Sequence, residues 1–184
     1  MFDLSPCETY NVSSPIIVRF KMFNAGLETY TVCFFGHRYI DRFTFVEGKI
    51  EELLNELFGE NKYLELLVGR DGDFDQIVSS SIRRAKNKFG DSNCAHVWVS
   101  PYATAEMNNN QDEFYKYYDE IEIASDRLGK LHPKAAFQAR NRMMVDRSDL
   151  VVVYIDHKSG GAYQTYQYAL KQGKRIINLA EEIR

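Results

Sequence analysis

The chain has 184 residues and a formal net charge of -3, from 23 basic and 26 acidic side chains. Domains commonly contain about 100–200 residues, so this length fits one domain with a complete hydrophobic core. Hydrophobic residues make up 45% and charged residues 27% of the sequence, a balance that excludes a disordered or collagen-like chain. The charge gives no indication of the basic face that duplex nucleic acid favours.

The three cysteines, Cys7, Cys33 and Cys94, are widely spaced and include no CxxC pair. A disulfide framework or a zinc knuckle is therefore not indicated. We expect Cys33 and Cys94, which lie in or beside apolar runs, to be buried as small hydrophobic residues. No segment has the roughly 18–20 apolar residues that span a membrane, and the first residues do not form a signal peptide. The sequence predicts a cytoplasmic protein with no membrane partner.

The pattern of apolar residues predicts an N-terminal extension, residues 1–28, with a possible strand at 16–23. From residue 29 onward strands and helices alternate. The predicted elements, in chain order, are strand 30–35, helix 44–58, strand 63–68, helix 75–88, strand 95–99, helix 134–147, strand 149–155, helix 162–172 and strand 175–179. Asp75 is the expected N-cap of the second helix, and Pro133 is expected to open the third.

Residues 102–118 contain five aromatic side chains and no clean period. A stretch of this length without regular structure is either functional or disordered. We interpret its aromatic residues as an interface or a lid over a pocket, as well as a contribution to the core.

Alternation of helices with strands that are apolar throughout predicts a parallel α/β sheet. The expected fold class is α/β, with a Rossmann-like doubly wound, mainly parallel sheet and helices on both faces. In such sheets ligands bind beyond the carboxyl ends of the strands, near the point where the strand order reverses.

Glycines, cations and carboxylates follow the predicted strands, at the ends where ligands bind. Glycine lets backbone N–H groups approach an anion, and the helix after Gly160 and Gly161 adds a partial positive charge. Arg38 is suited to a phosphate or a carboxylate. The sequence therefore predicts a site for a nucleotide or another phosphorylated small molecule. The residues expected to bind the ligand at these strand ends are Gly36, His37, Arg38, Gly69, Arg70, Asp71, Gly72, Asp75, Ser159, Gly160 and Gly161.

These residues also have purely structural explanations. Gly36 is equally explained as the end of a strand, His37 as a solvated loop residue, and the glycine pair as a flexible turn. Asp71 and Asp73 are spaced like half of a calcium-binding loop, but no glutamate stands at its closing position. We therefore expect no metal ion, and nothing in the sequence indicates a cofactor.

The segments FFGHR and GRDGDFDQ, together with residues 137–179, resemble the SLOG superfamily, which is named after the Smf/DprA DNA-processing proteins and the LOG cytokinin-activating enzymes. The likeness covers most of residues 30–180 and is greatest to the YpsA-like branch. It implies a Rossmann-like fold that binds nucleotides, nucleotide-derived signals or DNA. We accordingly interpret residues 29–184 as a SLOG-like nucleotide-binding domain.

LOG enzymes release ribose 5-phosphate from nucleoside monophosphates, and their signature combines R-K-x-x-M with PGGxGTxxE. Arg140 and Met144 match the first part, with Asn141 in place of lysine, and Gly160 and Gly161 match the double glycine. The threonine of the motif is shifted to Thr165, and its glutamate is absent. Since a glycosidic cleavage needs a carboxylate to stabilise the sugar cation, the resemblance supports binding better than hydrolysis.

Three functions follow as hypotheses. The main one is binding of a nucleotide-derived small molecule by a sensor or sequestering module, with Thr165 added to the pocket through the resemblance. The alternative is a LOG-like phosphoribohydrolase or N-glycosidase, in which Arg140 is catalytic and Asp71, Asp73 or Asp75 replaces the glutamate. The third is DprA-like binding of single-stranded DNA. The expected partners are a nucleotide-type small molecule and a second copy of the chain, with a dimer favoured and duplex nucleic acid not expected.

Overall fold

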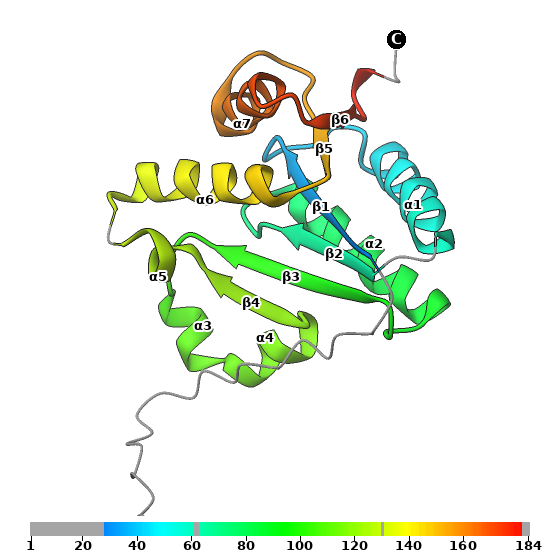
Figure 1. Cartoon of the computed structure of the whole chain (residues 1–184), viewed down its shortest axis with the longest axis horizontal. Helices are drawn as coiled ribbons and strands as arrows, with labels where there is room; N and C mark the ends of the chain where they lie inside the picture. Colours follow the sequence, from blue (N-terminus) through cyan, green and yellow to red (C-terminus); the bar gives the residue numbers. More distant parts are fainter. Residues whose placement is uncertain (1–27, 61–62, 130, 182–184) are drawn as a thin grey trace, which may run out of the picture.

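The computed structural model describes residues 28–60, 63–129 and 131–181 (Figure 1). The predicted extension therefore lies outside the described residues except for Glu28, and so does the possible strand at 16–23. In the described part of the chain, no helix is both long enough and apolar enough to cross a lipid bilayer.

One parallel sheet of six strands forms the centre of the molecule, in the order β4-β3-β2-β1-β5-β6. The chain adds β2, β3 and β4 on one side of β1 and then returns to add β5 and β6 on the other. The strand order thus reverses between β1 and β5, as in a doubly wound fold. The strands are β1 (Thr29–Gly36), β2 (Tyr63–Val68), β3 (Cys94–Ser100), β4 (Glu120–Ile123), β5 (Leu150–Tyr154) and β6 (Arg175–Asn178).

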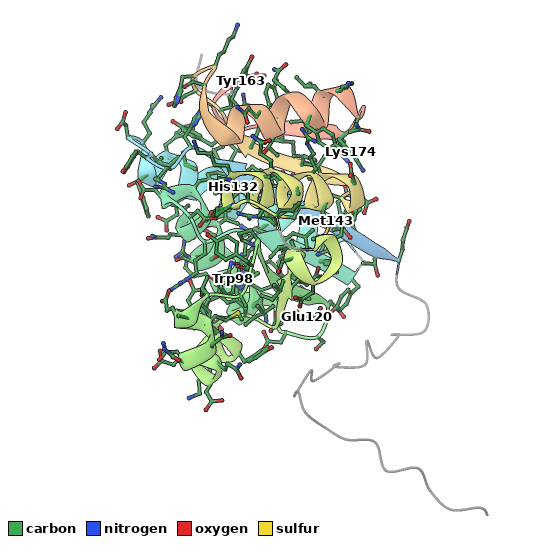
Figure 2. All side chains as sticks on the ribbon, turned by 90° about the vertical axis from the view of Figure 1, so that its left-hand side faces the viewer. Trp98, Glu120, His132, Met143, Tyr163 and Lys174 are labelled. Atoms are coloured by element: carbon green, nitrogen blue, oxygen red, sulfur yellow. The ribbon has the colours of Figure 1, made fainter. Side chains whose placement is uncertain are left out.

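Helices cover both faces of the sheet, which confirms the predicted fold class. On one face lie α1 (Phe43–Gly59) and α2 (Asp73–Phe89), with α4 (Gln111–Tyr117) further along beyond the short α3 (Ala105–Asn109). On the other face α6 (Pro133–Arg147) lies beside α7 (Gly160–Lys171), and Figure 2 looks onto this pair. The short α5 (Ala124–Leu128) leads from β4 toward α6.

The core has two halves, because successive side chains of a strand point to opposite faces. In β1, Val32 and Phe34 pack toward α1 and α2, whereas Cys33 and Phe35 pack toward α6 and α7. Central strands are buried on both faces, and this explains their unbroken apolar sequences. The predicted burial of Cys33 and Cys94 is confirmed.

Two sequence-based predictions of local structure are wrong. The N-cap of α2 is Gly72 rather than Asp75, and the Asp75 carboxylate instead accepts a hydrogen bond from the Asp71 backbone N–H at 2.7 Å. Residues 102–118 have regular structure, since they form α3 and α4 before the edge strand β4. Tertiary contacts hold these short helices, and one of them is the stacking of Phe114 on Trp98 at 5.1 Å between ring centroids.

Candidate functional site

A cavity of about 480 Å³ lies at the carboxyl ends of β1, β2 and β5, where the strand order reverses. We call it the glycine hollow. Its walls come from the loops after these three strands and from α6 and α7. The lining residues are Phe35, Gly36, His37, Arg38, Tyr39, Asp71, Gly72, Phe74, Asp75, Phe137, Arg140, Asn141, His157, Gly160, Gly161 and Ala162.

Two glycines allow the loops of the hollow to pack tightly. A Cβ atom on Gly36 would lie 2.2 Å from Cγ of Phe74, and one on Gly72 would lie 2.7 Å from the Arg38 Cα. The same loops are joined by a hydrogen bond from the Asp73 N–H to the Arg38 carbonyl at 2.8 Å. The first two loops of the site are therefore held in one arrangement by backbone contacts.

The N-terminus of α7 faces the hollow through Gly160, Gly161 and Ala162. Its N-cap, Ser159, makes no side-chain capping bond, so the first N–H groups keep their capacity to bind an anion. Gly160 has a φ of +84°, which favours glycine. A Cβ atom on Gly161 would meet nothing within 4 Å, so this end of the helix has open space before it.

The N-terminus of α2 also has no side-chain cap, but it differs from that of α7 because two aspartates stand in its first turn. Asp73 accepts a hydrogen bond from the Ile40 N–H at 3.1 Å, and Asp75 accepts one from the Asp71 N–H. Two carboxylates at this position oppose the approach of a phosphate. Of these two helices that border the hollow, α7 is the one suited to an anion.

Arg140 forms the floor of the hollow and is only 4% exposed. It donates to Asp71 at 2.9 Å, while its Nε atom has no hydrogen-bond partner among the described residues. Gly69 makes room for it, since a Cβ there would lie 2.9 Å from Nη1 of Arg140 and 2.7 Å from Oδ2 of Asp75. Burial raises the pKa of Asp75 to about 6, although the Asp71 N–H and the Arg140 charge act against this.

Arg38 and Tyr39 provide an exposed cation and an exposed ring at the mouth of the hollow. Within the described residues, Arg38 has no ion-pair partner. The Tyr39 side chain is 78% exposed, the highest value among the large apolar side chains described. This pair offers a charge for a phosphate and a flat surface for a base.

His37 is buried on the β5 side of the hollow, next to Asp156 and His157. Its Nε2 atom lies 3.3 Å from an Asp156 carboxylate oxygen, and its ring stacks on His157 with centroids 3.6 Å apart. Burial lowers the pKa of His37, with a smaller contribution from the His157 charge. The prediction of a solvated loop histidine therefore does not hold.

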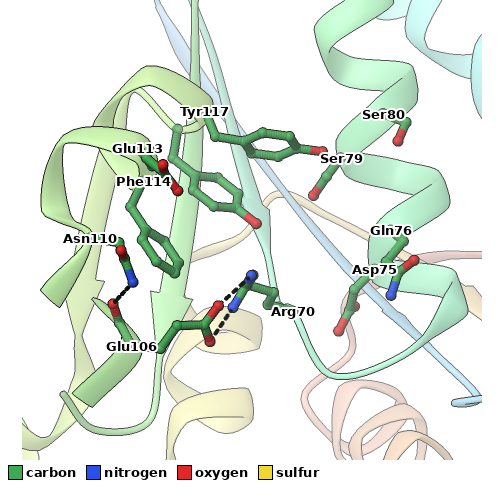
Figure 3. A pocket seen from close by; sticks show the side chains of 12 residues that line it. Arg70, Asp75, Gln76, Ser79, Ser80, Glu106, Asn110, Glu113, Phe114 and Tyr117 are labelled. Atoms are coloured by element: carbon green, nitrogen blue, oxygen red, sulfur yellow. Dashed lines mark hydrogen bonds and ion pairs between the residues drawn. The ribbon is translucent and has the colours of Figure 1, made fainter. Parts of the chain in front are cut away.

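A second cavity, of about 540 Å³, lies between α2 and the α3–α4 segment (Figure 3). We call it the aromatic hollow, after Phe114, Tyr117 and Tyr118 in its wall. Arg70 projects into it, is held by Glu106 through two bonds of 2.9 and 3.1 Å, and lies 4.8 Å from the centre of the Phe114 ring. The two hollows share Asp75 and are separated by the loop after β2.

The structure brings most of the predicted site residues together. The glycine hollow contains nine of them: Gly36, His37, Arg38, Asp71, Gly72, Asp75, Arg140, Gly160 and Gly161. Gly69 and Arg70 line the aromatic hollow instead. Ser159 and Thr165 line neither. Thr165 is buried, accepts a hydrogen bond from Asn141 at 2.9 Å and donates one to the Gly161 carbonyl at 3.0 Å.

Sequence reasoning missed Tyr39, Phe137 and His157 as lining residues of the glycine hollow. Simple signals were present for two of them. Tyr39 stands directly after Arg38 at the end of a strand, and Phe137 precedes Arg140 by three residues, which places both on one face of a helix. The wall of the aromatic hollow, by contrast, depends on how α3 and α4 fold back beside α2.

Comparison with known proteins identifies the fold. No family model and no curated protein matches the sequence. DNA processing protein A (DprA) from Streptococcus pneumoniae superposes with a TM-score of 0.57 and 20% identity, over 80% of this chain and 49% of that one. DprA from Helicobacter pylori gives 0.55 and 18%, over 80% of this chain and 63% of that one. The chain shares the fold of DprA proteins.

DprA proteins are among those that give the SLOG superfamily its name, and the likeness of this chain to them is one of fold. The likeness to the YpsA-like branch is not tested by it. The chain corresponds to less than two thirds of either DprA protein.

The comparison also corrects the prediction of partners. The net charge led to the expectation that duplex nucleic acid is not a partner and that a nucleotide-type small molecule is, and this expectation is wrong in setting nucleic acid aside. The H. pylori DprA, which has this fold, is described by its single-stranded DNA binding mode. A net charge of -3 is thus no basis for setting nucleic acid aside, since binding depends on the cations at the site and not on their sum over the chain.

Proposed function

We propose that the carboxyl edge of the sheet binds single-stranded DNA, with a backbone phosphate in the glycine hollow. The observation that carries this proposal is the meeting of the uncapped N-terminus of α7 with Arg38, which has no ion-pair partner in the described part of the chain, across one cavity. The shared fold with two DprA proteins, one of them described as binding single-stranded DNA, supports it.

The phosphate binds to the N–H groups of Gly160 and Gly161, where the helix dipole favours negative charge. Arg38 donates to the same phosphate from the opposite wall. Tyr39 stacks on an adjacent base, a contact that does not depend on sequence. The aromatic hollow accepts a further base on the other side of the loop after β2, next to Arg70 and Phe114.

Fluorescence anisotropy with a labelled oligothymidylate tests the proposal. Arg38→Ala is expected to weaken binding and to reduce the slope of log K against log salt by about 0.7, the value for one phosphate contact with a single strand. Arg175→Ala is the matched control, since Arg175 is also exposed but begins β6 at the opposite edge of the sheet. Equal losses in the two variants, or no binding by the unmodified chain, would contradict the proposal.

A second candidate function, favoured by one observation, is hydrolysis of an N-glycosidic bond in the same hollow. Asp71 and Asp75 stand beside Arg140, and the pKa of Asp75 is raised to about 6. A pair of carboxyl groups, one of them with a raised pKa, is the arrangement that glycosidases use to protonate a leaving group and stabilise a sugar cation. This candidate agrees with the LOG-like and YpsA-like resemblance of residues 29–184, interpreted as a nucleotide-binding domain.

Incubating the chain with a nucleoside monophosphate, and using that monophosphate to compete with the labelled oligonucleotide, separates three functions: binding of a DNA strand, hydrolysis, and binding of a free nucleotide. A hydrolase releases free base from a nucleoside monophosphate, and a nucleotide sensor binds the monophosphate unchanged and more tightly than the oligonucleotide. Neither result is expected if the hollow serves a DNA strand, for which a monophosphate is a weak competitor.

A further inference from the structure

Two neighbouring strands bring His37 together with Asp156 and His157, although His37 is far from the other two in the sequence. The register pairs Gly36 of β1 with Tyr154 of β5. The His37 N–H also donates to the Tyr154 carbonyl at 3.3 Å. The residues that follow the two strands therefore leave the sheet at the same level and meet at the rim of the glycine hollow.

The side chains of this trio converge on one point. Each offers one donor atom for a metal ion, and these atoms lie within 4.8 Å of one another. Oδ1 of Asp156 lies 3.3 Å from Nε2 of His37 and is hydrogen-bonded to Nδ1 of His157. A single carboxylate oxygen thus stands between two imidazole nitrogens.

The burial of His37 adds an indication of a ligand at the trio. The residue is 7% exposed, and its Nε2 atom lies 3.3 Å from Oδ1 of Asp156 without forming a well-directed hydrogen bond to it or to any other described residue. Buried polar atoms are nearly always satisfied, and an exception calls for an explanation such as an ion. This nitrogen is aimed at the trio, where an ion would be its partner.

We propose that His37, Asp156 and His157 bind a divalent first-row transition metal ion, of which zinc is the best probe. Two imidazoles and one carboxylate suit zinc or its neighbours, whereas magnesium and calcium prefer oxygen ligands throughout. Three protein ligands leave a position open for a further oxygen.

The site needs a small movement to close on the ion. Metal–ligand bonds of about 2.0–2.2 Å hold donor atoms roughly 3.4 Å apart in a tetrahedral site. The parallel rings of His37 and His157 must also turn apart, because stacked rings do not direct their nitrogens to one point. His157 and Asp156 can move, since their side chains are 56% and 44% exposed, while buried His37 is the fixed ligand.

The open position of the ion faces the glycine hollow, because His37 and His157 line it together with Gly160 and Gly161. A phosphate bound at the start of α7 would supply the further oxygen. This last step rests on the proposed function, whereas binding of the metal does not.

Isothermal titration of the metal-stripped, untagged chain with zinc chloride, without any nucleic acid, tests the site. We expect one zinc ion per chain and an affinity at least about tenfold lower for His157→Ala, since even outer-shell changes at metal sites cost that much. Asp156→Asn is also expected to lower the affinity for zinc. His132→Ala is the matched control, because His132 is also exposed but lies at the start of α6.

A titration in which His157→Ala binds zinc as tightly as the unmodified chain would overturn the proposal. The same holds if His132→Ala loses as much affinity as His157→Ala, because the zinc would then be held by surface histidines in general. Cobalt provides a second readout: a visible absorption band of a four-coordinate ion, lost in His157→Ala, supports the site, and its absence from the unmodified chain counts against it. Loss of DNA binding with zinc affinity intact would contradict the proposed function alone.

Discussion

Gly36 and Gly161 both line the glycine hollow, but they differ in what surrounds them. The Cβ position of Gly36 is filled by the buried Phe74 ring, whereas that of Gly161 is open. One glycine is required by the packing of the protein, and the other leaves space for a ligand. The sequence shows only that both are glycines at or after the end of a strand. It does not distinguish them, because the Phe74 ring that fills the space beside Gly36 belongs to a different element.

Gly36→Ala is expected to lower the free energy of unfolding by about 1–3 kcal/mol or more, the usual cost of overpacking a core. Gly161→Ala, the control, is expected to leave stability unchanged or slightly higher, since alanine favours a helix more than glycine does. Urea unfolding of the two variants measures both effects. Equal stability of the two would show that the Phe74 ring can move aside.

Among the elements, α7 and α2 show why a helix N-terminus after a parallel strand is not always an anion site. Neither helix has a side-chain cap, but the first turn of α2 contains Asp73 and Asp75, whereas the first turn of α7 contains no acidic residue. The sequence did distinguish them in part, since Asp73 and Asp75 stand in one and a glycine pair in the other. It did not reveal that Asp75 turns back toward Asp71.

Ser159→Asp is expected to have opposite effects on stability and on binding. A carboxylate at the N-cap of α7 stabilises the helix by about 0.5–1 kcal/mol, and it also occupies the place of the phosphate, so oligonucleotide affinity falls. Ser159→Asn, which caps without charge, is the control and is expected to retain more of the affinity. Thermal unfolding and anisotropy on the same samples measure the pair. An unchanged affinity in Ser159→Asp would mean that α7 does not hold the phosphate.

The four long helices and the strands β1, β2, β3, β5 and β6 were predictable from the sequence, whereas α3, α4, α5 and β4 were not. α1 and α2 each present an apolar face over several turns, Pro133 marks the start of α6 and Gly173 the end of α7, and β1, β2, β3 and β5 are apolar runs. By contrast, α3 has five residues and β4 has four that are only half-buried. Such elements carry too little periodicity to be recognised, so the aromatic hollow that they help to form could not be predicted either.

At the scale of the whole molecule, His96 makes the free energy of unfolding depend on pH. It is fully buried in β3, the strand beside the edge strand β4, and burial lowers its pKa to about 4 from the ordinary value of 6.5. The unfolded chain therefore takes up a proton at a higher pH than the folded chain. Its contribution to stability is complete above about pH 6.5 and is lost as the pH falls toward 4.

His96→Gln is accordingly expected to flatten the dependence of the unfolding free energy on pH between about 4 and 6.5, by on the order of 2–3 kcal/mol over that range. The slope is the readout, because the substitution also changes packing and so shifts stability at every pH. His132→Gln replaces an exposed histidine and is expected to leave the slope unchanged. If the His96→Gln slope equals that of the unmodified chain, His96 does not remain neutral in the folded state.

The contacts between the loops at Gly72 and Arg38 reduce the conformational entropy that is lost when a ligand binds. A backbone carbonyl, an N–H and a Cα atom fix these two loops to each other before any ligand arrives. Little conformational entropy then remains to be lost at this wall on association, which is the thermodynamic advantage of preorganisation. Conformational change on binding is then confined to the exposed side chains of Arg38, Tyr39 and His157, while the backbone of these two loops stays fixed.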